Sequence, residues 1–461
     1  MDPSDFRRHA HALADWIATY IEDVERYPVV PRVAPGDVRA ALPPEAPEHG
    51  EPFEAVLADF ERVLVPALTH WNQPGFLADF ASSTCGPGIL GEMLAAALNQ
   101  QAMLWKTSPA STELEEVSLG WLRQLVGLPQ AFEGVIYDTA SVSTLHALAA
   151  ARERAVPGVR AHGLSAAGAP LRVYCSEHAH SSVDKAVMTL GLGLDALRKI
   201  PADGEFRMRS EALAAAIDED VARGVRPMAV AATIGTTSTT SADPVAAIAK
   251  ICSARGVWLH VDAAYAGVAA MVPELRPLYD GWEQADSIVL NPHKWLFTPM
   301  DVSVLYCRQM DVLRAAFSLV PDFLKTAEGE AGVRNLMDTG IQLGRRFRSL
   351  KLWMVMREFG AEGMRAVYRE HLRLARLFAS WVDADSRFER VAPVPFSVVC
   401  FRLRGADELS ERLMERVNAS GEIYLSHTRL DGRFVIRLAI GHYATAERHI
   451  ARAWELLSRA V

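Results

Sequence analysis

Two residues of this sequence have the right types and positions for covalent cofactor chemistry. Lys294 lies in the run Asn-Pro-His-Lys-Trp, just past one apolar segment, and Asp262 closes another. A lysine amine can form a Schiff base with an aldehyde cofactor, and a carboxylate can keep a pyridine nitrogen protonated, which makes the ring an electron sink. The pair therefore fits pyridoxal 5′-phosphate chemistry. Taken singly, Lys294 also fits a surface loop, and Asp262 a helix N-cap.

Other candidates follow the ends of apolar segments in the same way. His180 comes after the segment ending at Tyr174 and could stack on a flat ring, or could be a capping or core histidine. Ala264 could supply a methyl contact to such a ring. Small and hydroxyl residues before a helix suit a phosphate, although an ordinary serine cap is the simpler reading. The residues in this group are Thr139, Ala140 and Ser141, with Thr237 a similar hydroxyl at another strand end.

The elements that must position these residues alternate between strands and helices. We expect buried strands at residues 134–137, 171–174, 228–232, 257–261 and 287–290, with helices such as 143–154 and 210–223 between them. This alternation predicts an α/β fold with a mostly parallel sheet covered by helices on both faces. Ligands bind such sheets at the carboxyl ends of the strands, where Asp262 and Lys294 fall.

The two ends of the chain differ from this central part. Residues 3–26 and 52–68 have helical apolar spacing, but two helices bury their apolar faces poorly, so we expect them to pack on a larger body or a second subunit. Beyond residue 353, a long helix and alternating segments indicate a small α+β unit. We therefore predict an N-terminal helical segment (1–78), a large cofactor-binding α/β domain (79–352) and a C-terminal α+β domain (353–461).

Composition narrows the class of protein. The 461 residues carry a net charge of −8, which argues against nucleic acid as the main partner. The five cysteines are scattered and none forms a C-x-x-C pair, so the sequence predicts neither a disulfide framework nor a metal site. No apolar run reaches the roughly 18 residues of a membrane span, and the first residues do not resemble a signal peptide. We expect a cytoplasmic protein with no membrane partner.

Six blocks in order carry a resemblance to a known family. The chain resembles the group II pyridoxal-dependent decarboxylases, most closely their aromatic-L-amino-acid branch. The resemblance implies a homodimer of fold type I, with the N-terminal helices clasping the partner and the site at the interface. The blocks are residues 109–115 (PASTELE), 179–182 (AHSS), 234–237 (IGTT), 258–267 (WLHVDAAYAG), 291–295 (NPHKW) and 343–351 (LGRRFRSLK).

The resemblance also implies residue roles and an activity. Lys294 would bind pyridoxal phosphate, Asp262 would pair with the pyridine nitrogen, and His180 would stack on the ring near the substrate carboxylate. The implied activity is decarboxylation of an aromatic amino acid (tryptophan, tyrosine, dihydroxyphenylalanine or phenylalanine) to its amine. The phosphate would be surrounded by Thr139, Ala140, Ser141, Asn291 and His293, and the substrate pocket, matching residues 76–84, would include Asp79, Phe80 and Ser82.

One departure from the family pattern bears on the product. Leu336 stands where the family has a loop tyrosine that donates a proton to the substrate Cα, and leucine cannot do so. Either His180 or a water supplies the proton, or the intermediate meets oxygen and yields an aldehyde, as in the related aldehyde synthases. We favour simple decarboxylation because His180 is retained.

Other departures bear on substrate and cofactor. Asp79 replaces a pocket tyrosine and either favours a polar substrate ring or points to solvent. Asp138 replaces a glycine beside the phosphate, which is awkward unless it turns away or caps the helix. Gly344 stands where phenol-preferring plant relatives carry serine, which leaves room for an indole. An aminotransferase, a glutamate decarboxylase or a non-catalytic relative would also keep Lys294 and Asp262.

Overall fold

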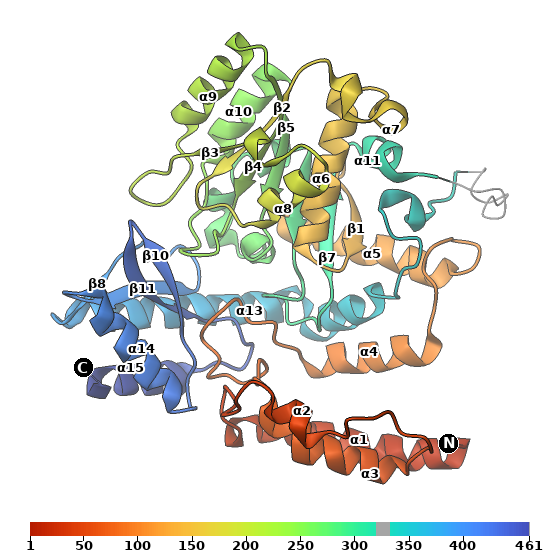
Figure 1. The fold of residues 1–461 in the computed structure, drawn as a ribbon, viewed down its shortest axis with the longest axis vertical. Helices are drawn as coiled ribbons and strands as arrows, with labels where there is room; N and C mark the ends of the chain where they lie inside the picture. The colour runs from red at the N-terminus through yellow and green to blue at the C-terminus, as the bar shows by residue number, and fades with distance from the viewer. Residues whose placement is uncertain (320–331, 461) are drawn as a thin grey trace.

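The candidate cofactor-binding residues that follow strands of the large sheet all lie at the carboxyl ends of those strands. The computed structural model describes residues 1–319 and 332–460, and its main feature is a seven-stranded sheet of order β1-β7-β6-β5-β4-β2-β3 (Figure 1). Neighbours within the run β6-β5-β4-β2-β3 pair in parallel, whereas β7 is antiparallel to both β1 and β6. The strands are β1 (Glu133–Tyr137), β2 (Leu171–Ser176), β3 (Leu197–Ile200), β4 (Arg226–Thr233), β5 (Trp258–Asp262), β6 (Ser287–Leu290) and β7 (Ser303–Cys307).

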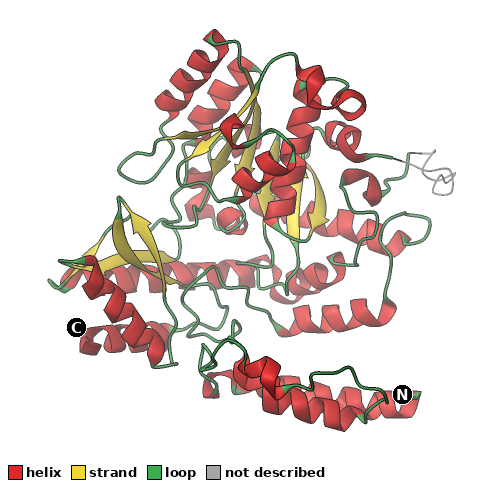
Figure 2. Ribbon diagram, viewed as in Figure 1, coloured by secondary structure: helices red, strands yellow, loops and turns green. Residues whose placement is uncertain are grey.

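Helices cover both faces of this sheet (Figure 2). Every residue of β5, β6 and β7 is buried, as expected for strands covered on both sides. The predicted α/β fold with a mostly parallel sheet covered on both faces is thus confirmed. The helices around the large sheet are α5 (Pro109–Val126), α6 (Ala140–Ala155), α7 (Val159–His162), α8 (Ser182–Thr189), α9 (Ser210–Ala222), α10 (Val245–Arg255) and α11 (Met310–Phe317).

A second sheet lies toward the C-terminus and is antiparallel throughout. Its order is β10-β11-β9-β8, formed by β8 (Phe388–Arg390), β9 (Val398–Leu403), β10 (Ser426–Leu430) and β11 (Arg433–Ala439). Helices α14 (Asp407–Ala419) and α15 (Glu447–Ala460) pack against one another and, with α13 (Ser349–Ala384), share one apolar core with this sheet. In Figure 1, α13 extends from below the large sheet to the small one, joining the two parts.

The N-terminal helices lie together at the bottom of Figure 1, away from the large sheet. They are α1 (Pro3–Glu22), α2 (Asp37–Ala41) and α3 (Phe53–Asp59), followed by α4 (Gly86–Leu98) nearer the body. Trp16 of α1 meets Phe60 edge-on at 5.4 Å, and Arg8 pairs with Glu54 at 2.5 Å. These contacts hold α1 against α3 and leave much of both helices exposed.

The observed elements depart from the sequence expectations in three places. The helix expected over 52–68 is α3 followed by a π-helical turn (Phe60–Leu64) and a 3₁₀ turn (Val65–Ala67). Strand β7 was missed although its apolar run resembles those of the predicted strands, and its antiparallel position between β1 and β6 follows from no local pattern. Strands β3, β8 and β10 were also missed, since they are short or only partly buried. Among the described residues, no helix is long and apolar enough to cross a membrane.

Candidate functional site

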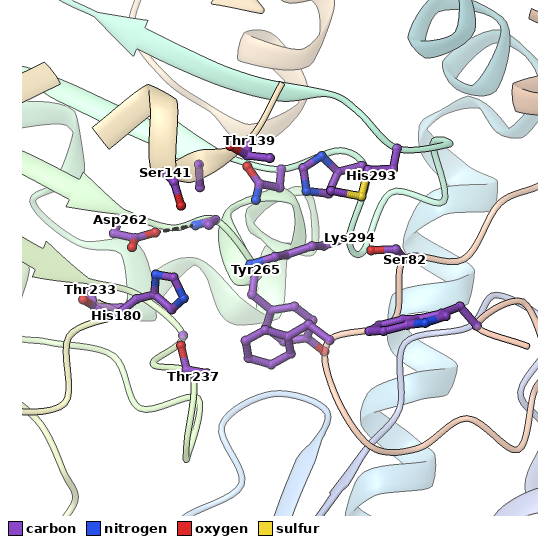
Figure 3. A pocket seen from close by; sticks show the side chains of 17 residues that line it. Ser82, Thr139, Ser141, His180, Thr233, Thr237, Asp262, Tyr265, His293 and Lys294 are labelled. Carbon is purple, nitrogen blue, oxygen red and sulfur yellow. Dashed lines mark hydrogen bonds between the residues drawn. The ribbon is translucent and has the colours of Figure 1, made fainter. Parts of the chain in front are cut away.

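The carboxyl ends of the central strands open into a pocket of about 550 Å³ (Figure 3). Its residues come from the loops that follow strands of the large sheet, from the start of α6 and from the segment after the N-terminal helices. The lining residues are Trp71, Phe80, Ser82, Thr139, Ala140, Ser141, His180, Thr233, Gly235, Thr237, Asp262, Ala264, Tyr265, Asn291, His293, Lys294 and Met300.

Lys294 and Asp262 face this pocket from neighbouring strands. Asp262 ends β5, and its Oδ1 accepts a hydrogen bond from the backbone N–H of Ala264 at 3.0 Å, which fixes the carboxylate (Figure 3). Lys294 lies in the turn after β6, where its N–H donates to the carbonyl of Asn291. Burial lowers the pKa of Lys294 below its ordinary 10.5, opposed by the charge of Asp262. The amine is thus shifted toward its neutral, nucleophilic form.

His180 lies across the pocket with its proton fixed on one nitrogen. The backbone N–H of Ser182 donates to His180 Nδ1 at 3.1 Å, so in the neutral ring the proton is carried by Nε2. Burial lowers the pKa of His180, and the charge of Asp262 partly opposes this. The residue therefore offers a neutral Nε2–H donor at neutral pH.

The start of α6 forms the anion-binding end of the pocket. Thr139 is the N-cap residue, but no side chain caps this helix, so the first N–H groups stay free for a ligand. Two contacts fix the helix over the sheet: Ser143 Oγ lies 2.8 Å from Ser303 Oγ, and Thr144 Oγ1 lies 3.3 Å from His260 Nε2.

Several features of the pocket fit pyridoxal phosphate. The side-chain oxygen of Asn291 is buried without a hydrogen-bond partner, and its amide can turn to present N–H groups to an anion. His293 Nδ1 accepts from the N–H of Val302 at 3.0 Å, and burial lowers the pKa of His293 to about 4. The donors of α6, a carboxylate opposite and a buried lysine amine match the cofactor's phosphate, ring nitrogen and aldehyde.

A stack of aromatic side chains forms another wall of the pocket. The rings of Phe80 and Tyr265 are stacked at 3.7 Å, and Tyr265 stacks in turn on Trp295 at 4.7 Å. The Lys294 amine lies 5.3 Å from the centre of the Phe80 ring. This wall is flat and apolar, and it reaches the reactive amine.

The pocket brings together twelve of the fourteen residues that the sequence analysis assigned to the cofactor or the substrate. Asp79 and Gly344 are exposed and do not belong to the lining that the described chain forms. Leu336 is buried in a short 3₁₀ turn (Leu336–Thr339) and is not part of the lining either. Sequence reasoning missed Trp71, Thr233, Tyr265 and Met300. Tyr265 directly follows Ala264 and could have been found, whereas Trp71 and Met300 carried no local signal.

A fold of this type, with a buried lysine and carboxylate at the strand ends, defines a pyridoxal-phosphate enzyme. Residues 35–404 match the model of the pyridoxal-dependent decarboxylase conserved domain. The chain is 42% identical to aromatic-L-amino-acid decarboxylase of Sus scrofa over 469 positions, covering 99% of this chain and 96% of the relative. It is 40% identical to phenylacetaldehyde synthase of Arabidopsis thaliana over 473 positions, covering 99% and 96%.

Solved structures agree with the sequence relatives. The structure of Oryza sativa TDC with PLP and tryptamine superposes with a TM-score of 0.96 at 37% identity, covering 100% of this chain and 98% of that one. The chain belongs to the pyridoxal-dependent decarboxylase family, and it is an enzyme, a carboxy-lyase that uses pyridoxal 5′-phosphate. The cofactor supplies the electron sink that accepts the electron pair left when carbon dioxide departs.

Proposed function

We propose that this enzyme decarboxylates an aromatic L-amino acid to its amine and carbon dioxide. The observation that supports the substrate class is the stacked wall of Phe80 and Tyr265, which ends beside the Lys294 amine. A flat apolar wall favours a planar side chain. The relatives named above include an aromatic-amino-acid decarboxylase, and tryptophan, tyrosine, dihydroxyphenylalanine and phenylalanine are the candidates.

The proposed roles follow from charge and position. Lys294 binds the cofactor covalently, and Asp262, held by the Ala264 N–H, keeps the ring nitrogen protonated. Preorganised charge of this kind is the largest electrostatic contribution we expect in the site. The phosphate is held by Thr139, Ala140, Ser141, Asn291 and His293, with Thr237 at the rim, Ala264 against the ring, and Ser82 facing the substrate.

His180 is the proposed proton donor. Its Nε2–H is fixed by the Ser182 contact to Nδ1, so the proton is on the nitrogen that is free of that contact. A donor near the substrate Cα favours protonation of that carbon and release of an amine. Because of this fixed tautomer, we propose the amine, rather than the aldehyde, as the main product.

Aldehyde formation is the second candidate function. Leu336 has no ionisable group, and among the relatives is a phenylacetaldehyde synthase. Where protonation of Cα is slow, oxygen can take the electrons, and the products are an aldehyde, ammonia, carbon dioxide and hydrogen peroxide.

One experiment tests both candidates. The holoenzyme is incubated with tryptophan, tyrosine, dihydroxyphenylalanine, phenylalanine, histidine and glutamate, and amine, aldehyde, peroxide and carbon dioxide are measured. We expect amine and carbon dioxide in equal amounts from an aromatic substrate. Aldehyde with matching peroxide would establish the second candidate, and turnover of only histidine or glutamate would overturn the aromatic assignment.

We also propose that the active enzyme is a homodimer whose interface adjoins the pocket. One face of α4 is apolar and open: Leu90 is 55% and Leu98 56% exposed, with Met93 and Leu94 between them. Two lining residues, Trp71 and Met300, are also exposed at the pocket mouth. A second subunit covering these surfaces would complete the pocket, and Gly344, exposed here, would be available to the partner's substrate.

The division of the chain and its location stay predictions. The proposed boundaries after residues 78 and 352 fall before the pocket-lining Phe80 and within α13, which shares cores with both sheets. Proteolysis tests these boundaries, and cell fractionation tests the cytoplasmic location.

A further inference from the structure

Asp138, at the end of β1, lies directly beside the anion-binding start of α6. Its Oδ1 accepts the backbone N–H of Thr139 at 2.6 Å and lies 3.3 Å from the Thr139 hydroxyl. The carboxylate therefore caps the residue that precedes the helix. It also takes one N–H that would otherwise be free for the cofactor's phosphate.

The other oxygen of Asp138 contacts a residue outside the pocket lining. Oδ2 accepts from the side-chain amide of Gln342 at 3.4 Å, in the segment that follows Leu336. Three further contacts seat this segment on the β1–α6 junction. The Tyr137 hydroxyl donates to the carbonyl of Thr339, the N–H of Ile341 donates to His146 Nε2 at 3.4 Å, and Gly340 packs so closely that an added Cβ would lie 2.9 Å from His146.

The start of α6 suits the cofactor's phosphate, and these contacts place a second anion, the Asp138 carboxylate, beside it. Two negative charges near one helix end repel each other, and the protein interior screens them less than water does. We propose that Asp138 is a positioning residue that weakens retention of pyridoxal phosphate, and that Gln342 limits this effect by holding the carboxylate away. The inference rests on the proposed placement of the phosphate at Thr139, Ala140 and Ser141.

As a consequence, the Asp138 carboxylate couples residues 339–342, which follow Leu336, to the cofactor site. When Gln342 holds Asp138, the carboxylate is directed toward residues 339–342. When this contact is lost, only the Thr139 contact holds the carboxylate, which can then turn toward the phosphate. Cofactor retention therefore depends on how this segment is seated.

The test is the rate of cofactor loss, measured from the visible absorbance of the holoenzyme after dilution into a carbonyl-trapping reagent. Asp138→Asn keeps the side-chain oxygen that accepts the Thr139 N–H and removes the charge, and we expect loss about tenfold slower. Gln342→Leu removes the second contact and is expected to speed loss about threefold. In the Asp138→Asn background, Gln342→Leu should change nothing.

Controls separate this inference from the proposed phosphate site. Asp2→Asn, which removes a carboxylate at the start of α1, far from the pocket, should leave cofactor loss unchanged. Ser141→Ala should speed loss; if it does not, the placement of the phosphate is wrong. If Ser141→Ala behaves as expected but Asp138→Asn loses cofactor as fast as wild type or faster, only the role of Asp138 is overturned. Equal effects of Gln342→Leu in both backgrounds also overturn it, and circular dichroism identifies variants that fail to fold.

Discussion

At the scale of single residues, the roles proposed for Lys294 and Asp262 follow from the different surroundings of the two side chains. Burial shifts the Lys294 amine toward its neutral form, while the carboxylate is held in place by the N–H of Ala264. A neutral amine attacks an aldehyde, and a fixed carboxylate keeps a ring nitrogen charged. The proposed chemistry thus depends on two side chains that adjacent strands, β5 and β6, bring to one pocket.

Replacing Lys294 by alanine should abolish covalent cofactor binding. We expect the visible absorbance that borohydride bleaches to disappear, and kcat to fall by roughly a thousandfold or more, since the amine supplies the covalent attachment. Lys250→Ala, on α10 outside the pocket lining, is the matched control and should retain both signals. A bleachable absorbance in the Lys294 variant would show that another amine binds the cofactor.

The pH dependence of cofactor capture follows from the lowered pKa of Lys294. A lowered pKa means that more of the amine is neutral at a given pH, so capture should stay fast at pH values below 10.5, where an ordinary lysine amine is mostly protonated. Capture should slow only as the pH falls through the lowered pKa of Lys294. The rate is measured by stopped-flow absorbance on apoenzyme mixed with pyridoxal phosphate. Nα-acetyl-lysine, with an ordinary side-chain pKa, should show the same decline at higher pH. Coincident profiles for protein and free amine would contradict the assignment.

Changing His180 should alter the product more than the binding of the cofactor. His180→Asn removes the Nε2–H, and we expect the ratio of aldehyde to amine to rise by about tenfold while the cofactor stays bound. Products are quantified by chromatography, with peroxide measured in parallel. His178→Asn, two residues away and outside the pocket lining, is the control. An unchanged ratio would mean that another group or a water protonates Cα.

At the scale of elements, a buried hydrogen-bond chain connects the lysine turn to the substrate side of the pocket. Trp295 Nε1 donates to His371 Nδ1 at 2.8 Å, and His371 Nε2 donates to the carbonyl of His442 at 3.0 Å. His442 Nε2 in turn donates to Asn72 at 3.2 Å, beside the lining residue Trp71. Burial lowers the pKa of His371 to about 4 and of His442 to about 3, so the chain stays neutral at ordinary pH.

Breaking this chain of hydrogen bonds should weaken substrate binding more than it slows the catalytic step. His442→Leu removes the donor to Asn72, and we expect KM for the aromatic substrate to rise about fivefold with a smaller change in kcat. His442→Gln, which can restore a donor, should recover most of the loss. Tyr174→Phe, which removes a buried hydrogen bond to Asp220 elsewhere, is the control. A fall in kcat alone would assign the chain to catalysis rather than to positioning.

At the scale of the whole molecule, the proposed second copy would cover the apolar face of α4 and the exposed pocket mouth. Leu94→Glu places a charge on that face, and we expect dissociation to monomers with activity reduced at least tenfold, because the pocket loses its cover. Mass is measured by light scattering alongside activity. Val221→Glu, on the exposed side of α9 and equally open, should remain dimeric and active. A fully active monomer would show that one chain holds a complete site.

The sequence by itself determined the chemistry of the site and the type of fold. Lys294, Asp262 and His180 follow strands whose apolar character is local, and strand ends in a parallel sheet meet at one edge. Only the tertiary structure decided the substrate side. Trp71 meets pocket residues that lie about 200 residues away in sequence, such as Asp262 and Lys294. Asp79 turns to solvent although Phe80 beside it lines the pocket, and β7 enters the sheet antiparallel. The local sequence pattern specifies which face of a helix or strand is buried, whereas the packing of distant segments specifies which residues contact that face.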